Sequence, residues 1–178
     1  MMAAQPQKAH NPKNFELKPL SKEGLGSALE KAGKYRLLNE PMLAESICLD
    51  ILGVDPDNQQ ATIELLLALT DQFSPGSTKT AKRALELAKG FSSEYLQHYY
   101  SGIVHERQGT VALKSNVPGC EFDAYEWYVE AMELYEKSEA VMPSGKEDPL
   151  LRWNTCARII NDHNLVPRPP DDGVQLLE

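Results

Sequence analysis

The feature of this sequence that most limits its fold is the spacing of its apolar residues, which recur every three or four positions with regular interruptions. This spacing places apolar side chains on one face of an α-helix. Alternation of the kind that builds a β-strand is nearly absent. We therefore expect an all-α protein. Its helices should lie at about 25–38, 41–54, 59–73, 78–90, 93–108, 122–141 and 148–162.

Short breaks between these segments contain the residues that end helices and form turns. Proline cannot donate a backbone hydrogen bond, and glycine, serine, asparagine and aspartate favour turn conformations. Short connections also favour antiparallel packing of consecutive helices. Four of the breaks read Asn39-Glu40-Pro41, Asp55-Pro56-Asp57-Asn58, Ser74-Pro75-Gly76-Ser77 and Met142-Pro143-Ser144-Gly145.

The two ends of the chain differ from this helical part. Residues 1–24 contain three prolines and many polar residues without periodicity, which predicts a flexible N-terminal arm. Residues 163–178 are also rich in proline and predict a C-terminal tail. The 178-residue chain therefore reads as one helical domain, over residues 25–162, between two irregular ends.

The helical segments also repeat one another. In two places a small residue is followed by residues four and seven positions later, and a proline closes the series after five more. The first copy carries this series as Ala44, Cys48, Ile51 and Pro56, and a later copy carries it as Ala131, Tyr135, Ser138 and Pro143. Small residues let two helices approach closely, and larger ones fill the space between repeats.

This pattern resembles the tetratricopeptide repeat (TPR) family, in which helix pairs of about 34 residues stack on one another. The resemblance implies a short right-handed superhelix of about three and a half repeats. Two departures are visible. The middle copy lacks its closing proline, and the third copy is lengthened by an insertion at residues 110–123, between its two helices.

In this family the first helix of each repeat lines a concave groove that holds a partner. The resemblance therefore implies a non-catalytic adaptor or scaffold that binds a peptide or helix. Most of the residues at groove positions are apolar, and exposed apolar area of this kind marks an interaction site. The predicted groove residues are Leu29, Arg36, Ile63, Leu67, Leu96, Tyr99, Ile103 and Trp153.

Some family members bind a C-terminal carboxylate with Lys, Arg and Asn side chains at fixed positions of the first helices. Here the corresponding positions hold Leu29 and Gly33 in the first repeat and Glu64 in the second. We therefore expect no cationic pocket.

Two alternatives to an open groove stay open at this point. With so few repeats, the array can curl until the groove positions become core, or the N-terminal arm or C-terminal tail can lie in the groove. The second functional hypothesis is a self-associating structural protein, whose groove or terminal half-repeat packs against another copy. It draws on the lack of a polar capping helix after Ile160, because repeat arrays need polar ends for solubility.

Negative charge is concentrated in one segment. The formal net charge is −8, and residues 121–148 hold nine acidic residues against two lysines, or −7. A solvated outer face is the favoured interpretation, with a docking stripe for a basic partner and a divalent-cation site as alternatives. The acids that share one helical face are Asp123, Glu126, Glu130 and Glu133.

Motifs of catalysis and cofactor binding are missing. The run His105-Glu106-Arg107-Gln108-Gly109 begins like a zinc-protease helix, but a glycine occupies the position of the second histidine ligand. We therefore expect neither an enzyme nor a bound cofactor or metal. An acidic pI near 5.1 disfavours nucleic acid as a partner. The sequence holds no apolar run of membrane-spanning length, and its three cysteines form no CxxC pair, so we expect a cytoplasmic protein.

Overall fold

The computed structural model describes residues 15–170, which form seven α-helices preceded by a short 3₁₀ turn, Lys22–Gly24. This part of the chain contains no strand, so the predicted all-α class is confirmed. The helices are α1 (Leu25–Leu37), α2 (Pro41–Val54), α3 (Gln59–Asp71), α4 (Thr78–Lys89), α5 (Glu94–Leu113), α6 (Cys120–Ala140) and α7 (Asp148–Asp162).

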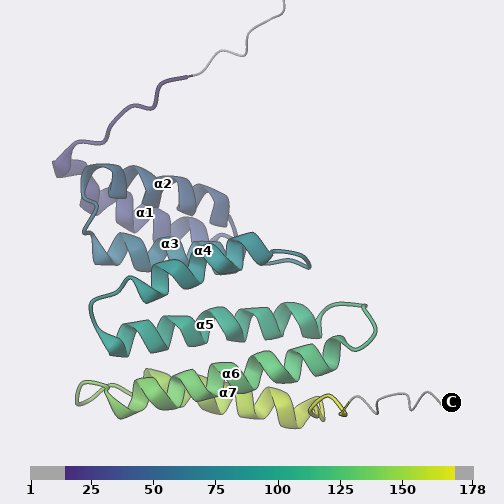
Figure 1. Cartoon of the computed structure of the whole chain (residues 1–178). Helices are drawn as coiled ribbons and strands as arrows, with labels where there is room; N and C mark the ends of the chain where they lie inside the picture. Colours follow the sequence, from purple (N-terminus) through teal and green to yellow (C-terminus); the bar gives the residue numbers. More distant parts are fainter. Residues whose placement is uncertain (1–14, 171–178) are drawn as a thin grey trace, which may run out of the picture.

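The helices run back and forth and stack in chain order, from α1 and α2 at one end to α6 and α7 at the other (Figure 1). Each helix packs against the next one along the chain. In addition, α1 contacts α3 and α3 contacts α5. The first helices of successive pairs are therefore neighbours, and their ends are brought to one side of the stack.

The predicted breaks coincide with the observed helix ends. Pro41 occupies the first turn of α2, where its missing N–H removes no helical hydrogen bond. The side chain of Asn58 accepts a hydrogen bond from the Ala61 backbone at 2.9 Å and caps α3. Gly76 and Gly145 have positive φ angles of 87° and 82° at their turns, which glycine adopts without strain.

Residues of the repeated series, and also Cys156 of α7, lie in the core. Ala44, Cys48, Ala131 and Cys156 are all fully buried. The first two belong to a cluster that also takes in α3, α4 and α5, while the last two belong to a second cluster among α5, α6 and α7. The small residues of the repeated sequence pattern therefore lie where neighbouring helices pack closely.

The third helix pair differs from its prediction. Most of residues 110–123 continues the helices, because α5 extends to Leu113 and α6 begins at Cys120, which leaves a loop of only residues 114–119. The hydroxyl of Thr110 holds this extension by hydrogen bonds to the Glu106 carbonyl oxygen and the Tyr128 hydroxyl. The chain therefore lengthens both helices instead of forming a long loop between them.

The α5–α6 pair also approaches unusually closely. A Cβ atom added to Gly102 would lie 2.6 Å from the ring of Tyr135, which is fully buried. The ring cannot move aside easily, since its hydroxyl donates a 2.6 Å hydrogen bond to the Glu106 carboxylate. Glycine is therefore required at position 102 by the spacing of the two helices.

Replacement of Gly102 tests this close approach. Gly102→Ala should lower the free energy of unfolding by about 1–3 kcal/mol, because overpacking outweighs the gain in helix propensity. Gly33→Ala is the matched control in α1, where an added Cβ meets nothing within 4 Å. It should raise stability by about 0.4–1 kcal/mol. Urea unfolding followed by circular dichroism measures both, and a stabilising Gly102→Ala would contradict the packing argument.

Candidate partner-binding site

The apolar residues predicted to line a groove instead pack against the core. Ile103 is only 2% exposed and belongs to the core, so it cannot touch a partner. The other predicted apolar groove residues keep part of their surface exposed. The partly buried ones, each packed against a core cluster, are Leu29, Ile63, Leu67, Leu96, Tyr99 and Trp153.

Two predicted groove residues line cavities: Tyr99 lines a small one beside α7, and Arg36 lines a larger one. Its guanidinium donates from Nε to Asp71 Oδ2 at 2.8 Å and from Nη1 to Glu64 Oε2 at 3.1 Å. Burial opposes the charge on Arg36, but the two carboxylates outweigh it and raise its pKa above the ordinary value. Arg36 therefore stays charged and ties the end of α1 to α3.

This cavity, the α1–α3–α5 cleft, has a volume of about 700 Å³. It lies where the ends of α1, α3 and α5 meet. Side chains from all three helices can therefore face a common ligand. Its lining consists of Gly33, Arg36, Leu37, Asn39, Glu64, Thr70, Asp71, Phe73, Arg107, Thr110, Val111 and Lys114.

The cleft brings cations together, contrary to the expectation that no cationic pocket would form. Arg36, Arg107 and Lys114 face two carboxylates, which leaves one positive charge in excess. The contact of Arg107 Nη2 with Asp71 Oδ1 is long, at 3.6 Å, and its buried Nε has no hydrogen-bond partner within residues 15–170. Sequence reasoning missed the site because Lys114 lies in the segment predicted to be an insertion, and because the fold brings Arg36 and Arg107 together from distant parts of the sequence.

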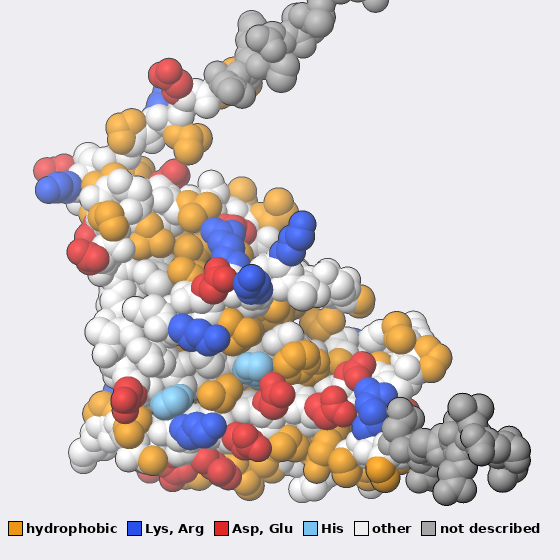
Figure 2. Space-filling view, viewed as in Figure 1, with side chains coloured by type: hydrophobic (Ala, Val, Ile, Leu, Met, Phe, Trp, Pro, Cys, Tyr) orange, Lys and Arg blue, Asp and Glu red, His pale blue; other side chains and the backbone are white. Residues whose placement is uncertain are grey.

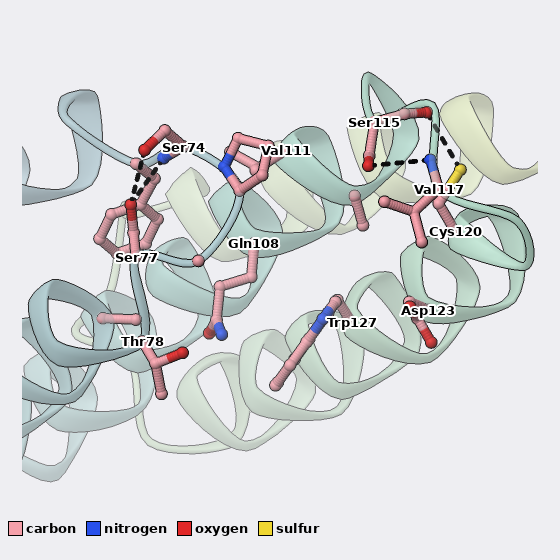
Figure 3. Close-up of a pocket in the computed structure, with 15 residues that line it drawn as sticks. Ser74, Ser77, Thr78, Gln108, Val111, Ser115, Val117, Cys120, Asp123 and Trp127 are labelled. Atoms are coloured by element: carbon pink, nitrogen blue, oxygen red, sulfur yellow. Dashed lines mark hydrogen bonds between the residues drawn. The ribbon is translucent and has the colours of Figure 1, made fainter.

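A second cavity, the end pocket, adjoins the cleft and has a volume of about 240 Å³. Figure 3 shows it between the α3–α4 turn and the joined ends of α5 and α6. Phe73 and Val111 line both cavities and form the wall between them. The remaining lining residues are Ser74, Pro75, Gly76, Ser77, Thr78, Ala81, Gln108, Ala112, Ser115, Val117, Cys120, Asp123 and Trp127.

The predicted acidic face is partly neutralised by the chain itself. Arg168 forms ion pairs with Asp123 and Glu126, and its guanidinium lies 5.4 Å from the centre of the Phe122 ring. Acidic side chains gather over α6 and α7 at the lower edge of Figure 2. Glu133 is exposed, as a solvated face requires.

Glu130, the remaining member of this face, lies beside a buried histidine. The carboxylate is 2.9 Å from His105 Nδ1, but the pair is not aligned as a hydrogen bond. Burial lowers the pKa of His105, although Glu130 acts in the opposite direction. The imidazole is therefore neutral near pH 7, and it packs beside the Trp127 ring with centroids 5.3 Å apart.

Part of the predicted C-terminal tail is docked on the helices. Leu165 is buried against the α5–α7 cluster, and Arg168 makes the contacts described above. The segment therefore follows the beginning of α6 and does not enter the cleft up to residue 170. Residues 1–14 of the predicted arm, which spans 1–24, and residues 171–178 of the tail lie outside the described residues.

A buried polar network joins the last three helices. Glu106 of α5 accepts the hydrogen bond from Tyr135 of α6 and forms a 2.9 Å ion pair with Arg152 of α7. Burial, and next the Glu106 carboxylate, raise the pKa of Tyr135, so the phenol remains a hydrogen-bond donor. The network was not predicted, since residues far apart in sequence supply it.

Breaking this network should destabilise the fold strongly. Arg152→Met should cost about 3 kcal/mol, at the lower end for a buried pair because the arginine side chain is 34% exposed. Arg168→Met is the matched control at exposed ion pairs and should cost less than about 1 kcal/mol. Urea unfolding at neutral pH measures both variants. Adding Glu106→Gln to Arg152→Met should restore part of the lost free energy of unfolding, because no charge then remains buried. Equal effects of Arg152→Met and Arg168→Met would contradict this account.

The two buried cysteines give no sign of nucleophilic chemistry. Cys48 and Cys156 are fully buried, and burial raises the pKa of each thiol to about 12. Both thiols are therefore protonated at neutral pH, whereas the thiolate is the nucleophile. Between residues 15 and 170, no three His, Cys, Asp or Glu side chains are arranged to hold a metal ion.

Comparisons of the chain with protein-family models, with curated proteins and with solved structures found no match. Within the described range, none of the helices combines the length and apolar character needed to cross a membrane. The observations together define an all-α chain of successively packed helices with two adjoining cavities at one side of the stack.

Proposed function

We propose that this chain is a non-catalytic interaction module of the tetratricopeptide type, and that the α1–α3–α5 cleft binds a polypeptide segment with an acidic side chain. The observation that carries the proposal is the cleft itself, with a volume of about 700 Å³ and an excess of positive charge. That volume lies within the range typical of ligand sites. The apolar ligand predicted from the sequence is replaced by an acidic one, because the apolar groove residues are buried or packed against the core while the cleft carries charge.

The packing of the first helices supports the repeat assignment. Contacts of α1 with α3 and of α3 with α5 are those expected when helix pairs stack in one direction. Burial of the small residues Ala44 and Ala131 agrees with their role as points of close helix approach. The shared side of such a stack is the natural location for a binding surface.

The cations of the cleft have different roles in this proposal. Arg36 is held by two carboxylates and fixes the wall of the cleft. Arg107 has only a long contact with Asp71, and Lys114 lies at the exposed end of α5. These two side chains can therefore turn to a partner carboxylate, and charge-assisted hydrogen bonds of this kind are about twice as strong as neutral ones.

Reversing one cleft charge tests the proposal. Peptides selected from a phage-displayed library on the wild-type protein should be enriched in Asp and Glu. Lys114→Glu should weaken the best of them at least about tenfold, as expected from losing a hydrogen bond to a charged group. Fluorescence anisotropy with the labelled peptide measures the affinity. Lys82→Glu, an equal charge change at an exposed position of α4, should leave it unchanged. Selection of the same peptides by Lys114→Glu would overturn the cleft as the binding site.

Self-association is the second candidate, and one surface favours it. At the corner between α1 and α2 the apolar side chains of Leu37, Leu38 and Met42 are 89%, 69% and 71% exposed. The first pair of a repeat array normally presents a polar face to solvent, so an apolar face at this end is suited to packing against another copy.

Sedimentation over a range of concentrations tests this candidate. The wild-type protein should shift from monomer to dimer as its concentration rises, and Leu38→Lys with Met42→Lys should abolish the shift. Both side chains are exposed, so the double substitution should leave the fold intact, which circular dichroism checks. A wild-type protein that stays monomeric at high concentration would rule out self-association through this corner.

A further inference from the structure

The end pocket contains a polar side chain without a partner inside the described protein. The amide oxygen of Gln108 is buried and accepts no hydrogen bond within residues 15–170. Figure 3 shows the Gln108 side chain between Thr78 and Trp127. A buried polar group left unpaired destabilises the protein. The amide is therefore a place where a ligand can supply the missing hydrogen bond.

The neighbouring polar groups are mostly occupied. The hydroxyls of Ser74 and Ser77 lie 3.0 Å apart and bond to each other. The Cys120 thiol donates to the Ser115 carbonyl oxygen at 3.2 Å, and Asp123 pairs with Arg168. Gln108 thus differs from the other polar groups of this pocket in having a buried side-chain atom without a hydrogen-bond partner in residues 15–170.

The size and walls of the end pocket define the kind of occupant. At about 240 Å³ it is smaller than the pockets that hold whole drug-sized ligands, and it fits a single side chain. Phe73, Val111 and Trp127 supply apolar and aromatic walls. Aromatic rings pack favourably against such walls in offset or edge-to-face arrangements.

The amide of Gln108 selects among aromatic side chains. A glutamine amide offers both an acceptor oxygen and a donor nitrogen, and a half turn of the terminal group exchanges their places. A phenolic hydroxyl both donates and accepts, so it can pair with either orientation of the amide. A phenylalanine ring would leave the amide unpaired.

We propose that the end pocket receives a tyrosine side chain of the partner polypeptide, with its hydroxyl on the Gln108 amide. This inference rests on the proposed function and adds an anchor residue to it. Because Phe73 and Val111 separate the two cavities, residues next to that tyrosine would lie over the cleft. The partner segment then combines a tyrosine with a nearby acidic residue, which complements Arg107 and Lys114 in charge.

A matched pair of small probes tests the pocket without knowledge of the partner. N-acetyl-L-tyrosine amide and N-acetyl-L-phenylalanine amide differ only in the hydroxyl group. In nuclear magnetic resonance titrations of the full chain, both should shift the Trp127 indole and Gln108 side-chain signals. The tyrosine probe should bind roughly fivefold more tightly, as one additional hydrogen bond of about 1 kcal/mol predicts. Equal affinities, or shifts confined to other parts of the chain, would overturn the proposal.

A substitution at Gln108 identifies the group responsible. Gln108→Leu keeps much of the side-chain shape and removes the unpaired amide, so the fivefold preference should disappear while thermal stability is maintained or rises. Gln72→Leu is the matched control, because the Gln72 amide donates to Glu45 at 2.8 Å and to the Ala68 carbonyl at 3.1 Å. It should lower stability and keep the tyrosine preference. A preference that survives in Gln108→Leu would refute the role of the amide.

The two proposals fail separately in these experiments. The wild-type comparison of the two probes does not depend on any variant folding correctly. Lys114→Glu should bind the tyrosine probe normally, since the side chain lies in the cleft and not in the end pocket. If Lys114→Glu loses the acidic peptide but still binds the tyrosine probe, the cleft contact is supported independently of the end pocket. If the wild-type protein shows no preference for the tyrosine probe, only the proposed tyrosine anchor is refuted.

Discussion

The close contact between α5 and α6 fixes the arrangement of the last three helices. Tyr135 lies on Gly102, and its hydroxyl meets the Glu106 carboxylate, which in turn holds Arg152 of α7. Three helices are thereby fixed in one register around a buried polar centre. With this register set, the additional turns of α5 and α6 reach past the α3–α4 turn. The cleft and the end pocket are formed at that overhang.

The sequence predicted the helices well because their signals are local. Periodic apolar residues, prolines and turn glycines act within a few positions, and the small core residues followed from the repeated spacing. The extension of α5 was missed for an identifiable reason. The predicted helix 93–108 stops before Gly109, whereas Gly109 lies inside α5. A Cβ atom added there would lie about 3.1 Å from the ring of Tyr128.

The candidate site could not be predicted in the same way. Helical spacing tells which residues share a face, but it does not tell how closely the next helix covers that face. Ile103 and Leu67 were placed on an open surface, yet they pack against the core clusters. The ion pairs of Arg36 with Asp71 and of Arg168 with Asp123 join residues 35 and 45 positions apart. Such pairings depend on the tertiary structure, which no local pattern encodes.

The wall shared by the two cavities has a thermodynamic consequence. Phe73 and Val111 line both the cleft and the end pocket. An occupant of one cavity that orders these two side chains changes the entropic cost of binding in the other cavity. Linkage requires the effect to be reciprocal, with each occupant altering the affinity of the other by the same factor. A single segment that fills both cavities would gain further from high effective concentration, because its second contact forms within an existing complex.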